Sequence, residues 1–446
     1  MIFPEIFSDH MVFQREKPIR IFGNGYGSGT VFFDGKIRSF RAEGDFIVEF
    51  PAHRAGGPYE IIITFSNDAP EPGERKNVRL ILRDVMVGDV FLAGGQSNME
   101  FRLRDADATE RTLEKLPKVR YFEEPHSANG EMELSFREKK WELFTPENEP
   151  DFSAVAYYFA CKYSAETDVP LGIVSCCRGA SRADAWMSPE TEDSEEVCRL
   201  TEIHHEDKEI YRFNQGHWLY ENKLKNVIPF ALKGVLWYQG ESNRRYEEAV
   251  HYDRLFEILV KDWRRMWADE LPFYTVQLMP FDEAPEKADW AEVRAAQERA
   301  SKNIPGVRMV TLFDTGEASE IHPTRKKGVG EALAKAVLAD AGKPETYSGP
   351  VLKSAKFSKD GAVLSFLYDE GLFIDGDTPK DLEAFSKGKK LEPDAAVIDG
   401  KLVLSGARGI DEVRLGFRNA CFHNLKNSAG YLASPFRILK EEKAQG

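Results

Sequence analysis

The sequence has few cysteines, no long apolar run and no excess of positive charge, and each absence argues against a class of protein. Its five cysteines are odd in number and form no CxxC pair, which argues against a disulfide framework and a thiolate zinc site. No apolar stretch reaches the roughly 18 residues that a membrane helix needs, since Lys233 interrupts the run over 227–238. The formal net charge of −14 argues against phosphate-backbone binding. We therefore expect neither nucleic acid nor a membrane as a partner.

Motifs that bind cofactors are missing as well. The chain has no HExxH, no His/Cys cluster and no DxDxDG loop, so nothing supports a catalytic metal. It has no GxGxxG after a strand and no GxxxxGK[ST], which argues against a nucleotide cofactor. The first residues lack the basic start, apolar core and cleavage site of a signal peptide. The missing motifs lead us to expect no cofactor, and the few cysteines lead us to expect a cytoplasmic protein.

What the chain does contain is a pattern of three regions. Residues 1–85 show period-two alternation and hairpin turns, which predict a β-rich region. Over 86–345, short apolar runs alternate with helical stretches, as is typical of a parallel sheet covered on both faces. Residues 346–446 are β-rich again. We expect the two flanks to pack together as one accessory β domain, because chain termini often lie close. The expected helices are 153–166, 248–267, 288–302 and 324–340.

In such sheets the active site lies at the carboxyl ends of the strands. The first candidate for a catalytic residue there is Ser97. The strand ending at Ala93 runs into Gly-Gly-Gln-Ser-Asn-Met, which places Ser97 behind two glycines. A hydroxyl there can face the crevice while backbone amides stabilise a negative oxygen. The pattern is not a GxSxG elbow, because Met99 stands where the second glycine would be. The alternative is a Gly-Gly turn whose serine binds local amides.

Two further strand ends carry candidate oxyanion donors. Gly179 lies in the segment 175–181, where its backbone N–H has no side chain in the way. Gln239 and Asn243 lie in Trp-Tyr-Gln-Gly-Glu-Ser-Asn, which follows another strand, and either amide can donate to an oxyanion. The alternatives are an ordinary strand-to-helix turn for the first segment and a loop cap for the second.

The fourth candidate segment contains Glu320 and His322. In an extended chain, residues i and i+2 point the same way, roughly 6.5–7 Å apart. A carboxylate that holds Nδ1–H leaves Nε2 free to accept a proton from serine. The alternative is a surface histidine near a helix N-cap. Arg294 and Gln297 share one face of the expected helix 288–302 and can reach substrate, although a solvated helix face is the alternative.

Taken in order, these segments resemble the sialate O-acetylesterase family of SGNH-type hydrolases, over nearly the whole chain. Single motifs of this kind are weak, but their joint order is specific. The resemblance implies a flavodoxin-like α/β core with a parallel sheet between β-rich flanks. The matching segments are Phe7–Arg15, Gly94–Met99, Arg178–Ser181 with Asp184 and Trp186, Trp237–Asn243, Val293–Gln297, Ile321–Pro323 and Ala433–Arg437.

The resemblance also implies roles for individual residues. Ser97 would be the nucleophile and His322 the general base. The oxyanion hole would be formed by the N–H groups of Ser97 and Gly179 and by a side chain of the third segment, Gln239 before Asn243. The residues expected to read the sugar are Trp186, Tyr238, Glu241, Asn243, Arg294 and Gln297.

The chain departs from the family pattern at two positions. Ala180 replaces a usual glycine, which would narrow the approach of ligand to the backbone. Ser319 stands three residues before His322, where a triad acid is often expected in this superfamily. That leaves Glu320 as the expected acid, Asp314 as the second candidate, and a dyad without an acid as the third.

The sequence therefore predicts a serine esterase that removes O-acetyl groups from sugars through an acetyl-serine intermediate. The expected substrate is O-acetylated sialic acid or an acetylated oligosaccharide, with xylan or mannan fragments as the alternative source. A competing interpretation is a carbohydrate-binding or scaffolding protein whose hydrolase core has lost activity. The sequence leaves open whether the protein is a homo-oligomer.

Overall fold

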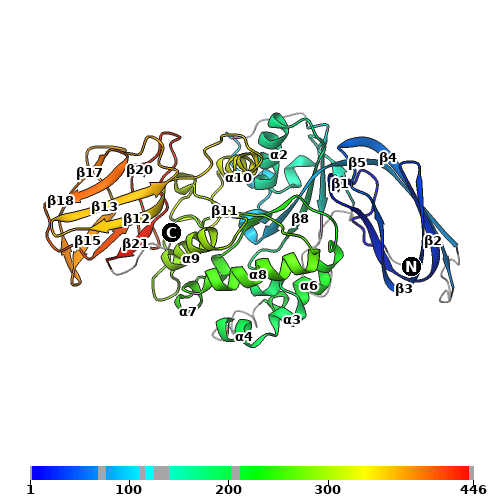
Figure 1. Ribbon diagram of the computed structural model, residues 1–446, viewed down its shortest axis with the longest axis horizontal. Helices are drawn as coiled ribbons and strands as arrows, with labels where there is room; N and C mark the ends of the chain where they lie inside the picture. The colour runs from blue at the N-terminus through cyan, green and yellow to red at the C-terminus, as the bar shows by residue number, and fades with distance from the viewer. Residues whose placement is uncertain (1–2, 69–76, 111–115, 125–139, 202–210, 441–446) are drawn as a thin grey trace.

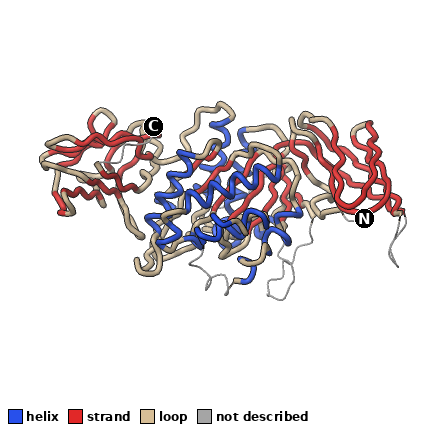
Figure 2. Tube along the Cα trace, turned by 60° about the horizontal axis from the view of Figure 1, so that its bottom comes forward, coloured by secondary structure: helices blue, strands red, loops and turns tan. Residues whose placement is uncertain are grey.

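The computed structural model describes residues 3–68, 77–110, 116–124, 140–201 and 211–440. The molecule is elongated, with helices and a central sheet between two β-rich ends (Figures 1 and 2). Among the described helices, none has both the length and the apolar composition that spanning a membrane requires.

Six parallel strands form the centre of the fold, in the spatial order β11-β10-β9-β5-β8-β6. In the parallel part of the sheet, including the second half of β5, their residues are almost all buried, which explains why they read as continuously apolar runs in the sequence. The short strand β7 adds to β6 in the antiparallel sense. The bounds of these strands are β5 Asn77–Gly95, β6 Val119–Glu123, β7 Glu142–Leu143, β8 Leu171–Cys177, β9 Gly234–Tyr238, β10 Phe273–Val276 and β11 Val307–Val310.

Helices cover both faces of this sheet, as Figure 1 shows, with α2 and α10 on one face and α8 and α9 on the other. All four correspond to expected helices. Side chains cap two of them: Ser153 Oγ accepts from the N–H of Ala156, and Asp289 Oδ1 accepts from the N–H of Glu292. The bounds are α1 Ser97–Glu100, α2 Ala154–Glu166, α3 Pro189–Glu192, α4 Glu195–Thr201, α6 Trp218–Asn222, α7 Tyr246–Ala249, α8 Tyr252–Trp267, α9 Trp290–Asn303 and α10 Lys327–Asp340.

Single-turn 3-10 helices connect several of these elements. Three of them, η3, η7 and η8, lie in the segments that carry candidate site residues. The bounds are η1 Leu103–Asp105, η2 Glu149–Asp151, η3 Asp184–Trp186, η5 Arg212–Asn214, η6 Leu224–Asn226, η7 Glu241–Asn243 and η8 Phe313–Thr315.

The N-terminal β strands extend the central sheet and share its core. Strand β5 is 19 residues long; its first half pairs antiparallel with β4, and its second half lies between β8 and β9. The domain boundary expected near residue 85 therefore falls inside one continuous strand. The other strands are β1 Val12–Gln14, β2 Ile19–Phe33, β3 Lys36–Phe50 and β4 Gly56–Asn67.

The C-terminal region has a hydrophobic core of its own, enclosed by two four-stranded antiparallel sheets. It docks on the central domain through α9, where Lys302 Nζ donates to the carbonyl oxygen of Leu352. Its strands are β12 Val351–Phe357, β13 Gly361–Leu367, β14 Phe373–Ile374, β15 Leu382–Ser386, β16 Lys389–Leu391, β17 Asp394–Ile398, β18 Lys401–Ser405, β19 Glu412–Leu415, β20 Leu425–Lys426 and β21 Phe436–Leu439.

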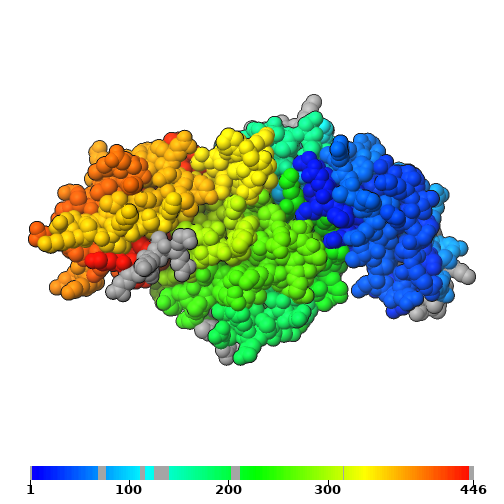
Figure 3. Space-filling model, viewed as in Figure 1, coloured from blue at the N-terminus to red at the C-terminus, as the bar shows by residue number. Residues whose placement is uncertain are grey.

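The two β flanks lie at opposite ends of the molecule (Figures 1 and 3), so the expectation of one shared accessory domain is wrong. The reason is the way each flank is attached. The N-terminal strands continue the central sheet through β5, whereas the C-terminal region follows α10 and packs on α9. Proximity of chain termini is a tendency, and here two separate attachment points override it.

Asp89 links the N-terminal segment to the central domain. Its carboxylate is fully buried and accepts hydrogen bonds from Arg15 Nε at 2.8 Å and Tyr163 Oη at 2.7 Å, and it lies 3.0 Å from Lys233 Nζ. Burial raises the pKa of Asp89, but the hydrogen bond from Arg15 and the charge of Lys233 outweigh it, so the net pKa lies below its ordinary value. The carboxylate is therefore ionised at neutral pH.

We expect Asp89→Ala to lower the free energy of unfolding by about 3 kcal/mol, because it removes one partner from a buried set of charges. Urea unfolding followed by circular dichroism measures this change. Asp168→Ala is the control, since Asp168 pairs with Lys118 at the surface, and it should unfold like the wild type. A loss below about 1 kcal/mol for Asp89→Ala would contradict the assignment.

Candidate active site

The sequence around Ser97 folds into a sharp turn from strand β5 into the one-turn helix α1. Gly95 ends the strand at a φ of +123°, and a Cβ there would lie 2.1 Å from the carbonyl oxygen of Tyr238, so only glycine fits. The next residue, Gln96, donates its N–H to that same carbonyl at 3.0 Å. This close approach of β5 to β9 leaves Ser97 half-buried at the carboxyl ends of the parallel strands.

His322 reaches Ser97 from the loop between η8 and α10. Its Nε2 lies 2.8 Å from the Ser97 hydroxyl oxygen, although 225 positions separate the two residues in the sequence. In the tautomer that this contact favours, the hydroxyl donates to Nε2 and the proton of the ring sits on Nδ1. The structure thus brings the expected nucleophile and general base together.

Neither expected acid contacts the imidazole. Glu320 Oε1 accepts a hydrogen bond from the backbone N–H of His322 at 2.9 Å, and Asp314 is exposed. The expectation for Glu320 assumed an extended chain, but the N–H of Glu320 bonds to the carbonyl oxygen of Glu317, which closes a tight turn. Within the residues that the structure describes, no carboxylate hydrogen-bonds to Nδ1 of His322.

Gly179 lies beside the nucleophile, but its N–H already has an acceptor. A Cβ on Gly179 would lie 3.6 Å from the Cβ of Ser97, and its N–H donates to Glu100 Oε2 at 2.6 Å. The expected oxyanion donor is therefore well placed and holds an internal carboxylate. The departure at Ala180 is also visible, since Ala180 has a left-handed φ of 58°, which costs a residue with a Cβ roughly 1–2 kcal/mol.

The amides of Gln239 and Asn243 do not point at the nucleophile. Gln239 is fully buried, and its Nε2 donates to Asn243 Oδ1 at 2.7 Å and to the carbonyl oxygen of Ser181 at 3.2 Å. Asn243 Nδ2 donates to Glu248 Oε1 at 2.7 Å. Because these donors are satisfied inside the protein, the expectation that either amide forms the oxyanion hole is not met. Both hold neighbouring loops in place.

Several residues expected to read the sugar are likewise buried and hydrogen-bonded to protein. Arg294 donates to the carbonyl oxygen of Asn419 at 3.3 Å, and Gln297 Nε2 donates to that of Gln239 at 3.1 Å. Trp186 Nε1 donates to Ser181 Oγ at 2.9 Å. Helix α9 turns Gln297 toward the ends of β9 and β10 and Arg294 toward carbonyl oxygens of the C-terminal region. Their polar groups are therefore satisfied inside the protein and do not face a substrate.

Glu241 and Tyr238 belong to a buried polar group that includes Asn98, the residue after Ser97, and the sequence did not predict this group. Asn98 Nδ2 donates to Glu241 Oε1 at 2.6 Å, and Asn98 Oδ1 accepts from Lys326 Nζ. The Lys326 ammonium lies 5.5 Å from the centroid of the Tyr238 ring, within cation–π range. Asn98 follows Ser97 directly and Lys326 lies four residues after His322, but nothing in the sequence indicated that the two would be buried together.

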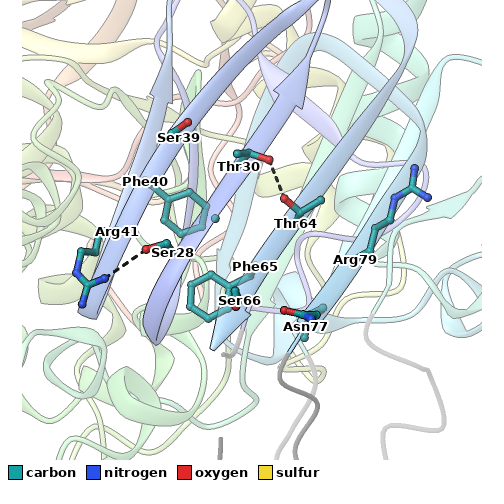
Figure 4. A pocket seen from close by; sticks show the side chains of 12 residues that line it. Ser28, Thr30, Ser39, Phe40, Arg41, Thr64, Phe65, Ser66, Asn77 and Arg79 are labelled. Atoms are coloured by element: carbon teal, nitrogen blue, oxygen red, sulfur yellow. Dashed lines mark hydrogen bonds between the residues drawn. The ribbon is translucent and has the colours of Figure 1, made fainter. Parts of the chain in front are cut away.

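An open pocket lies on the N-terminal part of the sheet, lined by residues of β2, β3, β4 and the first half of β5 (Figure 4). Its rim is mostly hydroxyl and guanidinium groups, among them Thr30 and Thr64, whose hydroxyl oxygens lie 2.7 Å apart. None of the candidate catalytic residues lines it. Among the described residues, no cluster of three or more histidine, cysteine or acidic side chains is arranged to hold a metal ion.

Comparison with known proteins identifies the family. A family model described as "carbohydrate esterase, sialic acid-specific acetylesterase" matches residues 87–339, more than half of the chain. The chain belongs to this family. It is 31% identical to a carbohydrate acetylesterase from Xanthomonas citri, whose crystal structure superposes with a TM-score of 0.81 over 98% of this chain and 99% of that one.

Curated relatives agree with the family assignment. Human sialate O-acetylesterase is 25% identical over 364 residues, which cover 75% of this chain and 68% of the human protein. The rat sialate O-acetylesterase is 24% identical over 441 residues, which cover 83% of this chain and 80% of the rat protein. The protein is therefore a carboxylic ester hydrolase of the sialic acid-specific acetylesterase family, on a mixed α/β fold.

In this esterase, the buried polar group sets the charge around His322. Burial lowers the pKa of Lys326 to about 7, although Glu241 and Glu320 act in the opposite direction. Burial and then the charge of Lys326 lower the pKa of His322, and Glu320 opposes them. Burial raises the pKa of Glu241. Since a depressed pKa keeps the imidazole neutral, His322 stays ready to accept a proton in mildly acidic solution.

We expect the acidic limb of the pH profile of kcat/KM to lie below the ordinary histidine value, and Lys326→Met to move it to higher pH. The sign follows because removing the lysine charge makes protonation of His322 easier, so the neutral base is lost sooner as the pH falls. Lys327→Met, at the next residue, where α10 begins, is the matched control and should leave the acidic limb in place. A limb that stays or moves to lower pH in Lys326→Met would contradict this electrostatic assignment.

Proposed function

We propose that the protein removes O-acetyl groups from sugars through an acetyl-serine intermediate on an SGNH-type hydrolase core. The observation that carries the proposal is the 2.8 Å contact between Ser97 Oγ and His322 Nε2. The family membership supports the acetyl group and the sugar. The order of the six parallel strands, with the serine turn after β5, supports the flavodoxin-like core.

In the first step, the Ser97 hydroxyl attacks the acetyl carbonyl carbon while His322 Nε2 accepts its proton. The negative oxygen that forms needs donors beside Ser97. The N–H of Gly179 lies there, and in this structure it bonds to Glu100. The substrate carbonyl must therefore take the place of the Glu100 carboxylate. Each such donor is worth on the order of 10²–10³ in rate.

When this intermediate collapses, the bond to the sugar breaks and His322 gives its proton to the departing sugar oxygen, which leaves as a hydroxyl. In the second half of the reaction, water attacks the acetyl-serine while His322 accepts a proton from it, and His322 passes that proton to Ser97 Oγ as acetate leaves. His322 changes between base and acid without a carboxylate on Nδ1. The proposed mechanism is therefore that of a serine–histidine dyad.

For the substrate, we infer an O-acetylated sialic acid or an acetylated oligosaccharide. The sialate O-acetylesterases among the relatives favour the first, and the bacterial carbohydrate acetylesterase leaves xylan and mannan fragments as the alternative source. A small acyl group needs little room, so the sugar must be read by the surface around the dyad.

We expect Ser97→Ala to lower acetate release from p-nitrophenyl acetate by about 10³–10⁶-fold, because no other nucleophile replaces the hydroxyl. The rate is followed by the absorbance of p-nitrophenolate, and the fold is checked by circular dichroism. Ser66→Ala, on the exposed face of the N-terminal sheet, is the control and should be fully active. Activity of Ser97→Ala within tenfold of the wild type would contradict the nucleophile assignment.

A substrate panel separates the candidate sugars. We expect kcat/KM for acetate release to be highest on O-acetylated sialic acid, and lower on acetylated xylo-oligosaccharides and manno-oligosaccharides at equal acetyl concentration. Enzymatic assay of free acetate gives all three values on one scale. A clear preference for either neutral oligosaccharide would reject the sialic acid assignment while leaving the esterase intact.

A further inference from the structure

The peptide bond between Ile321 and His322 is hydrogen-bonded on both sides. Its carbonyl oxygen, from Ile321, accepts from Asn98 Nδ2 at 3.0 Å. Its N–H, from His322, donates to Glu320 Oε1 at 2.9 Å. Because a peptide unit is planar, fixing both groups fixes the plane from which the Cα–Cβ bond of His322 leaves the backbone. The direction of the imidazole is then restricted before its ring makes any contact.

One of the two residues that hold this peptide is attached directly to the nucleophile. Asn98 follows Ser97 in the chain, within the same turn of α1. Its contact with Ile321 spans 223 positions and ties the serine turn to the histidine loop. A displacement of either loop therefore moves the hydroxyl and the imidazole together, which preserves their 2.8 Å contact.

The amide of Asn98 can take only one orientation. With Lys326 charged, Asn98 Oδ1 accepts from an ammonium that can only donate, and with Glu241 ionised, Asn98 Nδ2 donates to a carboxylate that can only accept. A flipped amide would set Oδ1 against Glu241 and Nδ2 against Lys326. The three side chains are between 1% and 3% exposed, so water does not relax the arrangement. Asn98 therefore presents its donor to Ile321 before substrate arrives.

An aromatic ring lies near both the lysine and the histidine. The Lys326 ammonium lies 4.9 Å from the centroid of the Phe101 ring, and that centroid lies 6.4 Å from the centroid of the His322 imidazole. Lys326 is also the N-cap residue of α10 and lies four residues after His322 in the chain.

We propose that Asn98 and Glu320 are positioning residues that clamp the Ile321–His322 peptide and thereby aim Nε2 of His322 at Ser97. The clamp does the orienting that a carboxylate on Nδ1 performs in a complete triad. It rests on the proposed function, because aiming matters only if Ser97 and His322 carry the reaction. Glu320 acts here as a hydrogen-bond acceptor for a backbone N–H, and its negative charge is not what the clamp needs.

A pair of substitutions at Glu320 tests the clamp. Glu320 is exposed, so both variants should fold. Glu320→Ala removes the acceptor, and we expect kcat on p-nitrophenyl acetate to fall on the order of 10- to 10²-fold with KM within twofold, because the imidazole loses its aim. Glu320→Gln keeps an oxygen that accepts from His322 N–H, and it should retain at least about a third of the wild-type kcat.

The outcomes separate the clamp from a triad acid. If Glu320→Gln is as slow as Glu320→Ala, the charge of Glu320 is what matters and the clamp is wrong. If both variants are as fast as the wild type, the N–H half of the clamp has no function and the proposal also fails. Glu317→Ala and Glu317→Gln are the matched controls, since Glu317 is an exposed acid in the same loop whose side chain makes no contact with His322.

Asn98→Asp tests the other half. Aspartate can still accept from Lys326, but it cannot donate to Ile321 and it places a second carboxylate beside Glu241. We expect kcat to fall on the order of 10²-fold while KM changes little, and unchanged kcat would overturn this half of the clamp. Other results would contradict the proposed function itself: a wild-type protein that releases no acetate, or a Ser97→Ala variant that still releases it. Should Asn98→Asp not fold, the Glu320 pair still decides.

Discussion

The function that we infer depends on one hydrogen bond, between the Ser97 hydroxyl and Nε2 of His322. It joins a turn after the middle strand of a parallel sheet to a loop that precedes α10, and its length is 2.8 Å. Neither residue is held by a partner of the kind found in a complete triad. The contact depends instead on how closely β5 and β9 approach at Gly95, and on how the histidine loop is fixed to the residue that follows the serine.

The charged side chains buried near this contact lose their hydration, which disfavours the folded state. Lys326 is 1% exposed and bonds to the Asn98 amide, which separates it from Glu241. Buried charges seldom add stability, and their replacement by apolar side chains is often neutral or favourable. Their value here is orientation: they hold the Asn98 amide in one direction and depress the proton affinity of His322. The same buried residues thus orient His322 and lower its pKa.

Much of the architecture could be predicted from the sequence because it follows from periodicity. The apolar runs and helical stretches between 86 and 345 gave the parallel sheet, and the four expected helices are present as α2, α8, α9 and α10. The order of strand ends likewise placed Ser97 and His322 at one edge of the sheet. Both predictions depend on backbone topology, which a pattern of apolar and polar residues largely determines.

The wrong expectations concern the direction of single side chains and the docking of whole regions. Glu320 was expected on the imidazole, but a tight turn sends it to a backbone N–H. Gln239 and Arg294 follow or face active-site elements, yet both point into the interior. The direction of a side chain depends on single dihedral angles and on which face of a helix packs against the protein. A short sequence motif specifies neither. Lys326 reads in the sequence as a surface residue at a helix start, and its burial follows only from tertiary packing.

The central claim, that Ser97 is activated for attack by His322, is tested most directly with a serine-directed organophosphate such as paraoxon. The protein is treated with the reagent, its residual esterase activity is measured, and the modified peptide is located by tandem mass spectrometry. The account predicts one phosphoryl adduct, on Ser97, whose extent rises in proportion to the loss of activity. Loss of activity with Ser97 unmodified, or full modification of Ser97 with activity retained, would contradict it.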